Sequence, residues 1–103
     1  MIKFIKEGSK IICQPQFSII ASNAMEMRNQ LLLQIENDDA WSELILDCDK
    51  VEVVDSIGIN LIVGLYKKSE DESKKFMVKN CNEPLYKVLK LFRLDEQFIL
   101  ESK

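Results

Sequence analysis

One stretch, residues 53–63, constrains the possible folds of this chain more than any other: it reads Val-Val-Asp-Ser-Ile-Gly-Ile-Asn-Leu-Ile-Val. Its apolar residues recur at helical spacing, i, i+3, i+4 and i+7, at Ile59, Ile62, Val63 and Tyr66. Asp55 and Ser56 come directly before that run, and Ser56 is expected to cap the helix. A helix start presents unpaired N–H groups and positive dipole, which suit a phosphate or a carboxylate.

Strand and helix patterns alternate through the rest of the chain. A hairpin is expected first, with strands at Ile2–Ile5 and Ile11–Cys13 around the turn at residues 7–10. A helix should begin near Ser22-Asn23, with a capping box from Asn23 to Glu26, and end at Asn37-Asp38-Asp39. In that helix Met25 and Met27 are interpreted as core filler.

The second half of the chain continues the alternation. Leu44-Ile45-Leu46 is an unbroken apolar run typical of a strand buried on both faces. Further segments are a strand at Phe76–Val78, a helix capped by Asn82 with Pro84 in its first turn, and a little strand at Ile99-Leu100. The order predicts an α/β fold: residues 1–103 as a single domain, with a small mixed sheet of about four to five strands and helices mainly on one face.

The composition argues against nucleic-acid binding and membrane insertion. Fourteen Lys and Arg against 17 Asp and Glu give a net charge of -3, which argues against a nucleic-acid surface. No run approaches 18 apolar residues, and the N-terminus lacks the apolar core of a signal peptide. We therefore expect a cytoplasmic protein without direct membrane insertion.

Metal and catalytic chemistry are also not expected. The chain has no histidine and no CxxC, so a zinc site and the Ser-His and Cys-His nucleophile pairs lack their ligands and bases. Cys13, Cys48 and Cys81 are interpreted as small buried hydrophobes. Asp47, Asp49 and Asp55 do not have the spacing of a calcium loop and are interpreted as surface turn carboxylates. We expect no cofactor, no catalytic residue and no enzymatic activity.

Three segments together resemble a STAS domain, the fold of the anti-sigma factor antagonists that also occurs in some transporters. They are Leu44-Ile45-Leu46-Asp47-Cys48, Val54-Asp55-Ser56-Ile57-Gly58-Ile59 and the run from Asn82 to Leu94. In the antagonist branch, the resemblance implies a partner switch. A kinase-like anti-sigma factor phosphorylates a serine or threonine at the turn, and the added negative charge prevents binding.

This chain departs from the antagonist pattern at the acceptor. The residue before the glycine, usually the phospho-acceptor, is Ile57, which has no hydroxyl. Ser56 is the remaining phosphorylation candidate. The predicted partner-binding residues are Asp55, Ser56, Ile57, Gly58, Ile59, Asn60, Gly64 and Lys67.

Two partners agree with the resemblance. One is an anti-sigma factor or related kinase-like ATPase, bound through the turn and the exposed face of the following helix. The other is the ATPase of an ABC-type lipid transporter, because accessory STAS subunits of such complexes carry an Asp-Thr-x-Gly turn. Asp55-Ser56-Ile57-Gly58 matches that turn, because Ser56 has its hydroxyl at the position of the threonine and Ile57 is the apolar residue before the glycine. The sequence leaves both partners and the oligomeric state open.

Overall fold

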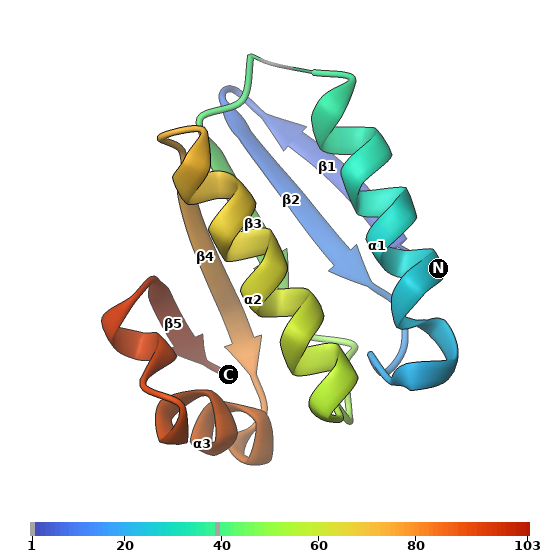
Figure 1. The fold of residues 1–103 in the computed structure, drawn as a ribbon, viewed down its shortest axis with the longest axis vertical. Coiled ribbons are helices and arrows are strands. Elements are labelled where there is room, and N and C mark those ends of the chain that lie inside the picture. Colours follow the sequence, from blue (N-terminus) through green and yellow to red (C-terminus); the bar gives the residue numbers. More distant parts are fainter. Residues whose placement is uncertain (1, 39) are drawn as a thin grey trace.

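A computed structural model describes residues 2–38 and 40–103. The elements follow one another as β1 (Ile2–Glu7), β2 (Lys10–Pro15), α1 (Ala21–Glu36), β3 (Glu43–Asp47), α2 (Ser56–Asp71), β4 (Lys75–Cys81), α3 (Glu83–Leu91), the 3-10 helix η1 (Leu94–Glu96) and β5 (Ile99–Ser102) (Figure 1). Asp39, predicted to help end the first long helix, lies outside the described residues. Among the described residues, no helix is long and apolar enough to cross a membrane.

The five strands form one mixed sheet in the order β1-β2-β3-β4-β5. β1 and β2 are antiparallel, and Gly8 takes a positive φ of 61° in the turn between them, which glycine adopts without steric cost. The other neighbours, β2 to β5, pair in parallel. The predicted mixed α/β fold is confirmed.

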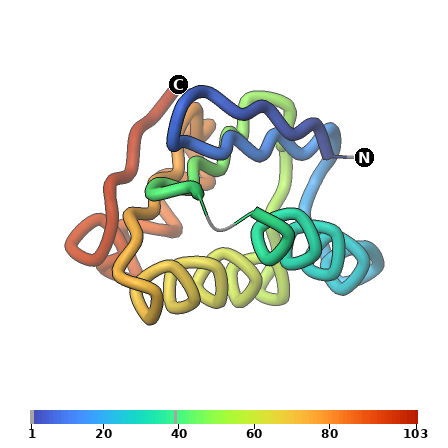
Figure 2. The backbone as a smooth tube through the Cα atoms, turned by 90° about the horizontal axis from the view of Figure 1, so that it is seen from above, coloured from blue at the N-terminus to red at the C-terminus, as the bar shows by residue number. Residues whose placement is uncertain are grey.

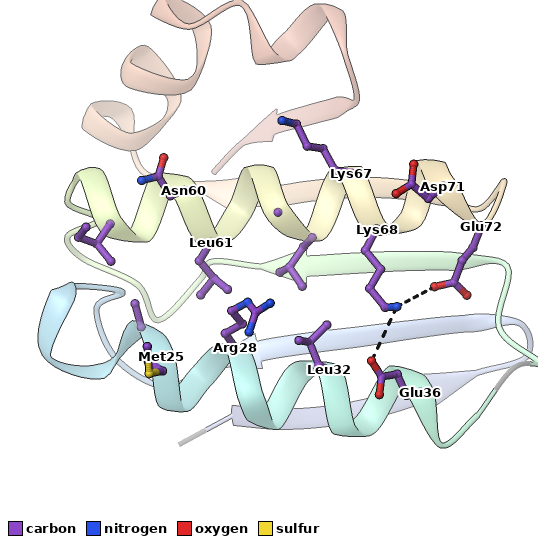
Figure 3. A pocket seen from close by; sticks show the side chains of 14 residues that line it. Met25, Arg28, Leu32, Glu36, Asn60, Leu61, Lys67, Lys68, Asp71 and Glu72 are labelled. Carbon is purple, nitrogen blue, oxygen red and sulfur yellow. Dashed lines mark ion pairs between the residues drawn. The ribbon is translucent and has the colours of Figure 1, made fainter.

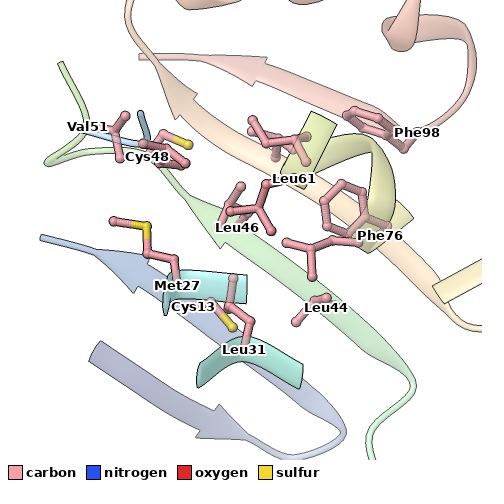
Figure 4. Packing of buried hydrophobic residues seen from close by; sticks show 14 of the residues in the cluster. Cys13, Met27, Leu31, Leu44, Leu46, Cys48, Val51, Leu61, Phe76 and Phe98 are labelled. Carbon is pink, nitrogen blue, oxygen red and sulfur yellow. The ribbon is translucent and has the colours of Figure 1, made fainter. Parts of the chain in front are cut away.

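The helices cover one face of this sheet (Figure 2). Strand residues on that side, among them Leu44 and Leu46, pack with Leu31 of α1 (Figure 4). Ile62 of α2 and Leu89 of α3 belong to the same hydrophobic core. These five side chains are each no more than 1% exposed. Burial of this apolar surface is what holds the helices to the sheet.

All three cysteines are buried, as predicted. Burial raises the pKa of the Cys13 thiol to about 12. At neutral pH this thiol stays protonated and packs as a small apolar group.

Asp47 is not a surface turn carboxylate, so that prediction is wrong. It is 6% exposed, and its carboxylate accepts hydrogen bonds from Gln14 Nε2 at 2.9 Å and from Asn80 Nδ2 at 2.8 Å. It also accepts the backbone N–H of Asp49 at 3.1 Å. Neighbouring strands supply the two amides, and local sequence pattern carries no information about such contacts.

The start of α1 also differs from the prediction. The helix begins at Ala21 with Ile20 at the N-cap position, so Asn23 is the third helical residue. The Asn23 side-chain oxygen accepts the Ile20 N–H at 3.0 Å, which is the returning half of a capping box. Asn23 does take part in capping α1, as predicted, but as the third residue of the helix and not as its N-cap residue.

Candidate functional site

Asp55 organises the turn that leads into α2. It is the N-cap residue, and Oδ1 accepts the Gly58 N–H at 2.9 Å. Oδ2 accepts the N–H of Ala21, the first residue of α1, at 2.8 Å. Hydrogen bonds from the Gly58 and Ala21 amides hold the pKa of the Asp55 carboxyl below its usual value. One carboxylate thus satisfies an N-terminal amide of each of two helices.

Gly58 allows the chain before α1 to approach this turn closely. A Cβ at Gly58 would overlap the carbonyl oxygen of Ile19 and lie 2.6 Å from Val54 Cγ1. Ile19 also donates its N–H to the Val53 carbonyl at 3.0 Å and accepts the Asp55 N–H at 3.3 Å. Glycine at this position is therefore a packing requirement, and it fixes the turn against the start of α1.

Ser56 is the first residue of α2 and is exposed, so it does not occupy the N-cap position that the sequence suggested. Asp55 caps the helix because its side chain is the one that reaches the Gly58 N–H. Ile57 follows in the same turn and is 46% exposed. A hydroxyl and an apolar side chain therefore lie together at the positive end of the helix dipole.

The other predicted contact residues separate into two groups. Asn60, Gly64 and Lys67 are exposed along α2, on the side expected for a contact surface. Gly58 and Ile59 are buried, with Ile59 8% exposed in the core. Neither residue offers an exposed side chain in this structure, and their contact with a partner stays a prediction.

Two hollows lie beside α2, one along its length and one beside its first half. The larger, the α1–α2 groove, has a volume of about 640 Å³ and includes Ile57, Leu61 and Gly64 of α2 and Met25, Arg28 and Leu32 of α1 in its lining (Figure 3). The smaller, the α2–α3 hollow, has a volume of about 360 Å³. Asp55 and Ser56 line it opposite Val88 and Phe92. The start of α2 is thus a ridge between two depressions.

The contribution of α1 to this surface was missed. Met25 is 75% exposed and lines the groove, so its interpretation as core filler is wrong, whereas Met27 is 3% exposed and confirms it. The two methionines point to opposite sides because they are two residues apart on a helix. Helical phasing could have separated them, but only packing brings Met25 beside α2.

Within residues 2–38 and 40–103, no group of three or more cysteine or carboxylate side chains could hold a metal ion. What the surface offers is a helix N-terminus, an exposed Ile57 and two partly apolar hollows. These are features of a protein-binding surface.

The family profile described as STAS domain matches residues 3–103, almost the whole chain. The chain belongs to the STAS domain family.

Solved structures agree with the fold of this STAS domain. A protein from Thermotoga maritima assigned as an anti-sigma factor antagonist superposes with a TM-score of 0.91 at 20% identity, covering 99% of this chain and 86% of that one. The phosphorylated form of the Bacillus cell fate determinant SpoIIAA gives 0.76 at 13% identity, covering 100% and 93%. Part of the murine anion transporter Slc26a9 gives 0.81 at 17% identity, covering 96% of this chain and 17% of the transporter.

Proposed function

We propose that this STAS domain is a non-enzymatic regulatory module that binds an anti-sigma factor or a related kinase-like ATPase. Its contact surface is the turn at Asp55 and Ser56, Ile57, and the exposed face of α2 with Asn60, Gly64 and Lys67. The partner contacts the ridge formed by the start of α2.

The exposure of Ile57 is the observation that carries this proposal. Its side chain is 46% exposed on the first turn of α2, at the position where phosphorylated antagonists have their acceptor. An apolar group at the centre of a contact surface favours association. Because Ile57 has no hydroxyl, phosphorylation cannot switch binding off at this position. Ser56, exposed one residue earlier, is the remaining place for a phosphate.

A second candidate is an accessory subunit that docks on the ATPase of an ABC-type lipid transporter. The order of groups in the turn favours it, since a hydroxyl at Ser56 and an apolar residue at Ile57 precede Gly58. In this alternative Ser56 is a permanent contact residue. The same surface serves both candidates, so the identity of the bound ATPase distinguishes them.

The test is affinity capture from the native cells with tagged wild-type protein and Ile57→Glu, read by quantitative mass spectrometry. Leu33→Glu is the matched control, because Leu33 is also an exposed apolar residue, at 64%, but does not line either hollow. We expect wild type and Leu33→Glu to retain a kinase-like ATPase and Ile57→Glu to lose it.

The identity of the captured protein decides between the candidates. An ABC-type ATPase together with its membrane subunit, lost with Ile57→Glu, would support the transport alternative. If no ATPase of either class depends on Ile57, the proposed contact surface is wrong.

A further inference from the structure

The α1–α2 groove is open at one end and closed at the other. At the closed end Lys68 of α2 reaches Glu36 of α1 at 3.7 Å and Glu72 at 3.3 Å (Figure 3). These ion pairs bridge the two helices and place Lys68 between two carboxylates. At the open end, beside Ile57 and Met25, no such bridge among the described residues crosses the groove.

The middle of the groove is lined by apolar residues and contains space that no side chain fills. Leu32 of α1 and Leu61 of α2 line it from opposite sides (Figure 3). Gly64 lines it as well, and a Cβ at this position would meet no atom within 4 Å. The missing side chain leaves space for an inserted group at the point where an ordinary helix residue would project.

The charge at the open half of the groove is positive. Arg28 is exposed there, and within the described part of the chain it makes no ion pair or hydrogen bond. It lies in the same groove as Ile57, on the first turn of α2. Asn60 and Lys67 also line the groove, but both point away from α1 in Figure 3, so Arg28 is the cation that α1 contributes. The acidic lining residues, Glu36, Asp71 and Glu72, belong to the closed end.

From this arrangement we infer that the partner inserts an apolar side chain of an acidic amphipathic helix into the α1–α2 groove, with a carboxylate on Arg28. Arg offers a planar fork of donors that a carboxylate matches in two hydrogen bonds. Apolar anchors at i, i+3, i+4 and i+7 are how such a helix engages a groove. This inference rests on the proposed function and specifies its partner, extending the contact surface from α2 onto α1.

The test uses fluorescence anisotropy with two labelled model helices of about 14 residues. Both carry leucine and phenylalanine at the four anchor positions; one has glutamates on its flanks and the other has lysines at the same places. We expect the wild-type protein to bind the glutamate helix at least about tenfold more tightly than the lysine helix. Arg28→Glu should remove this preference, whereas Lys50→Glu, the same charge change on an exposed residue outside the groove, should leave it intact.

A second variant fills the groove with a new side chain. Gly64→Leu places a side chain in the open space and should weaken the glutamate helix at least about tenfold without loss of folding. Asn29→Leu adds the same group to α1 outside the groove and should bind like wild type. Thermal melts of each variant separate loss of binding from loss of fold.

Several results would overturn the inference: no binding of either helix, equal affinity for both, or unchanged binding by Gly64→Leu. Preferential binding to phosphatidylcholine–phosphatidylglycerol vesicles over the glutamate helix would also overturn it. If an ATPase captured from cells depends on Ile57 but not on Gly64 or Arg28, the inference fails while the proposed function stands. If capture does not depend on Ile57, the proposed function fails whatever the model helices do.

Discussion

The Asp55 carboxylate and the N–H of Ala21, 34 residues apart in the chain, form a 2.8 Å hydrogen bond that joins the starts of α2 and α1. The other carboxylate oxygen caps α2 itself through the Gly58 N–H. The Asp55 side chain therefore helps to fix the starts of the two helices beside one another, at the open end of the α1–α2 groove.

Replacing Asp55 by alanine removes both hydrogen bonds. We expect Asp55→Ala to lower the melting temperature by roughly 5 °C. Asp55→Asn should have a smaller effect, because its single oxygen can still accept one amide. Asp71→Ala, at an exposed carboxylate near the end of α2, is the control and should leave the melting temperature nearly unchanged. Equal melting temperatures for wild type and Asp55→Ala would contradict the double-cap role.

The two glycines of α2 should respond oppositely to alanine. Gly58→Ala forces a Cβ against the Ile19 carbonyl oxygen, a backbone atom that cannot move away cheaply, so we expect a loss of about 2–4 kcal/mol. Gly64→Ala meets nothing within 4 Å and gains helix propensity, so we expect stabilisation of up to about 1 kcal/mol. Urea unfolding of both variants measures the difference. Similar destabilisation by both would show that the close approach at Gly58 is not the cause.

The buried carboxylate of Asp47 should make stability depend on pH. Burial raises its pKa, but hydrogen bonds from Asn80 and Gln14 lower it by more, so the native pKa is below the ordinary 3.8. Its stabilisation is therefore fully present above pH 3.8 and is lost as the pH falls through the lowered native value. Asp47→Asn should cost about 2 kcal/mol at neutral pH, because an amide group then faces the two amide donors.

Urea unfolding of wild type and Asp47→Asn at a series of acidic pH values tests whether the stabilisation by Asp47 falls as the pH falls. The stability difference between them should shrink as the pH falls below 3.8. A difference that stays constant, or grows, would contradict the hydrogen-bonded ionised state of Asp47.

Restoring the acceptor should restore phosphorylation. We expect Ile57→Ser to be phosphorylated on residue 57 by a cognate kinase, because the new hydroxyl is exposed on the first turn of α2. Mass spectrometry of the treated protein reads the site, with wild type as the control. A kinase that is active on another antagonist but leaves residue 57 unmodified would count against the resemblance at this turn.

A negative charge at Ser56 should weaken partner binding. Ser56→Asp places a carboxylate beside Asp55 on the contact surface, where the partner must desolvate it. We expect at least about a tenfold loss of affinity by calorimetry with the captured ATPase. Ser56→Ala, which removes the hydroxyl without adding charge, is the control. Unchanged affinity of Ser56→Asp would exclude Ser56 as a place where phosphate could act.

The succession of helices and strands could be predicted from local sequence patterns. Alternating apolar runs and helical spacing identified β3 at Leu44–Leu46 and the amphipathic face of α2. The sequence also identified the polar turn at Asp55 and Gly58 that carries the resemblance to the STAS family. These features are encoded by residues within a few positions of one another, so spacing alone reveals them.

Long-range packing settles which polar and apolar side chains are buried and which line the surface hollows. Asp47 is buried because Gln14 and Asn80, each 33 residues away, supply its hydrogen bonds. Met25 lines a groove because α2 packs beside that face of α1. Each outcome depends on the placement of segments far apart in the chain, which is set by packing of the whole core and not by any local pattern.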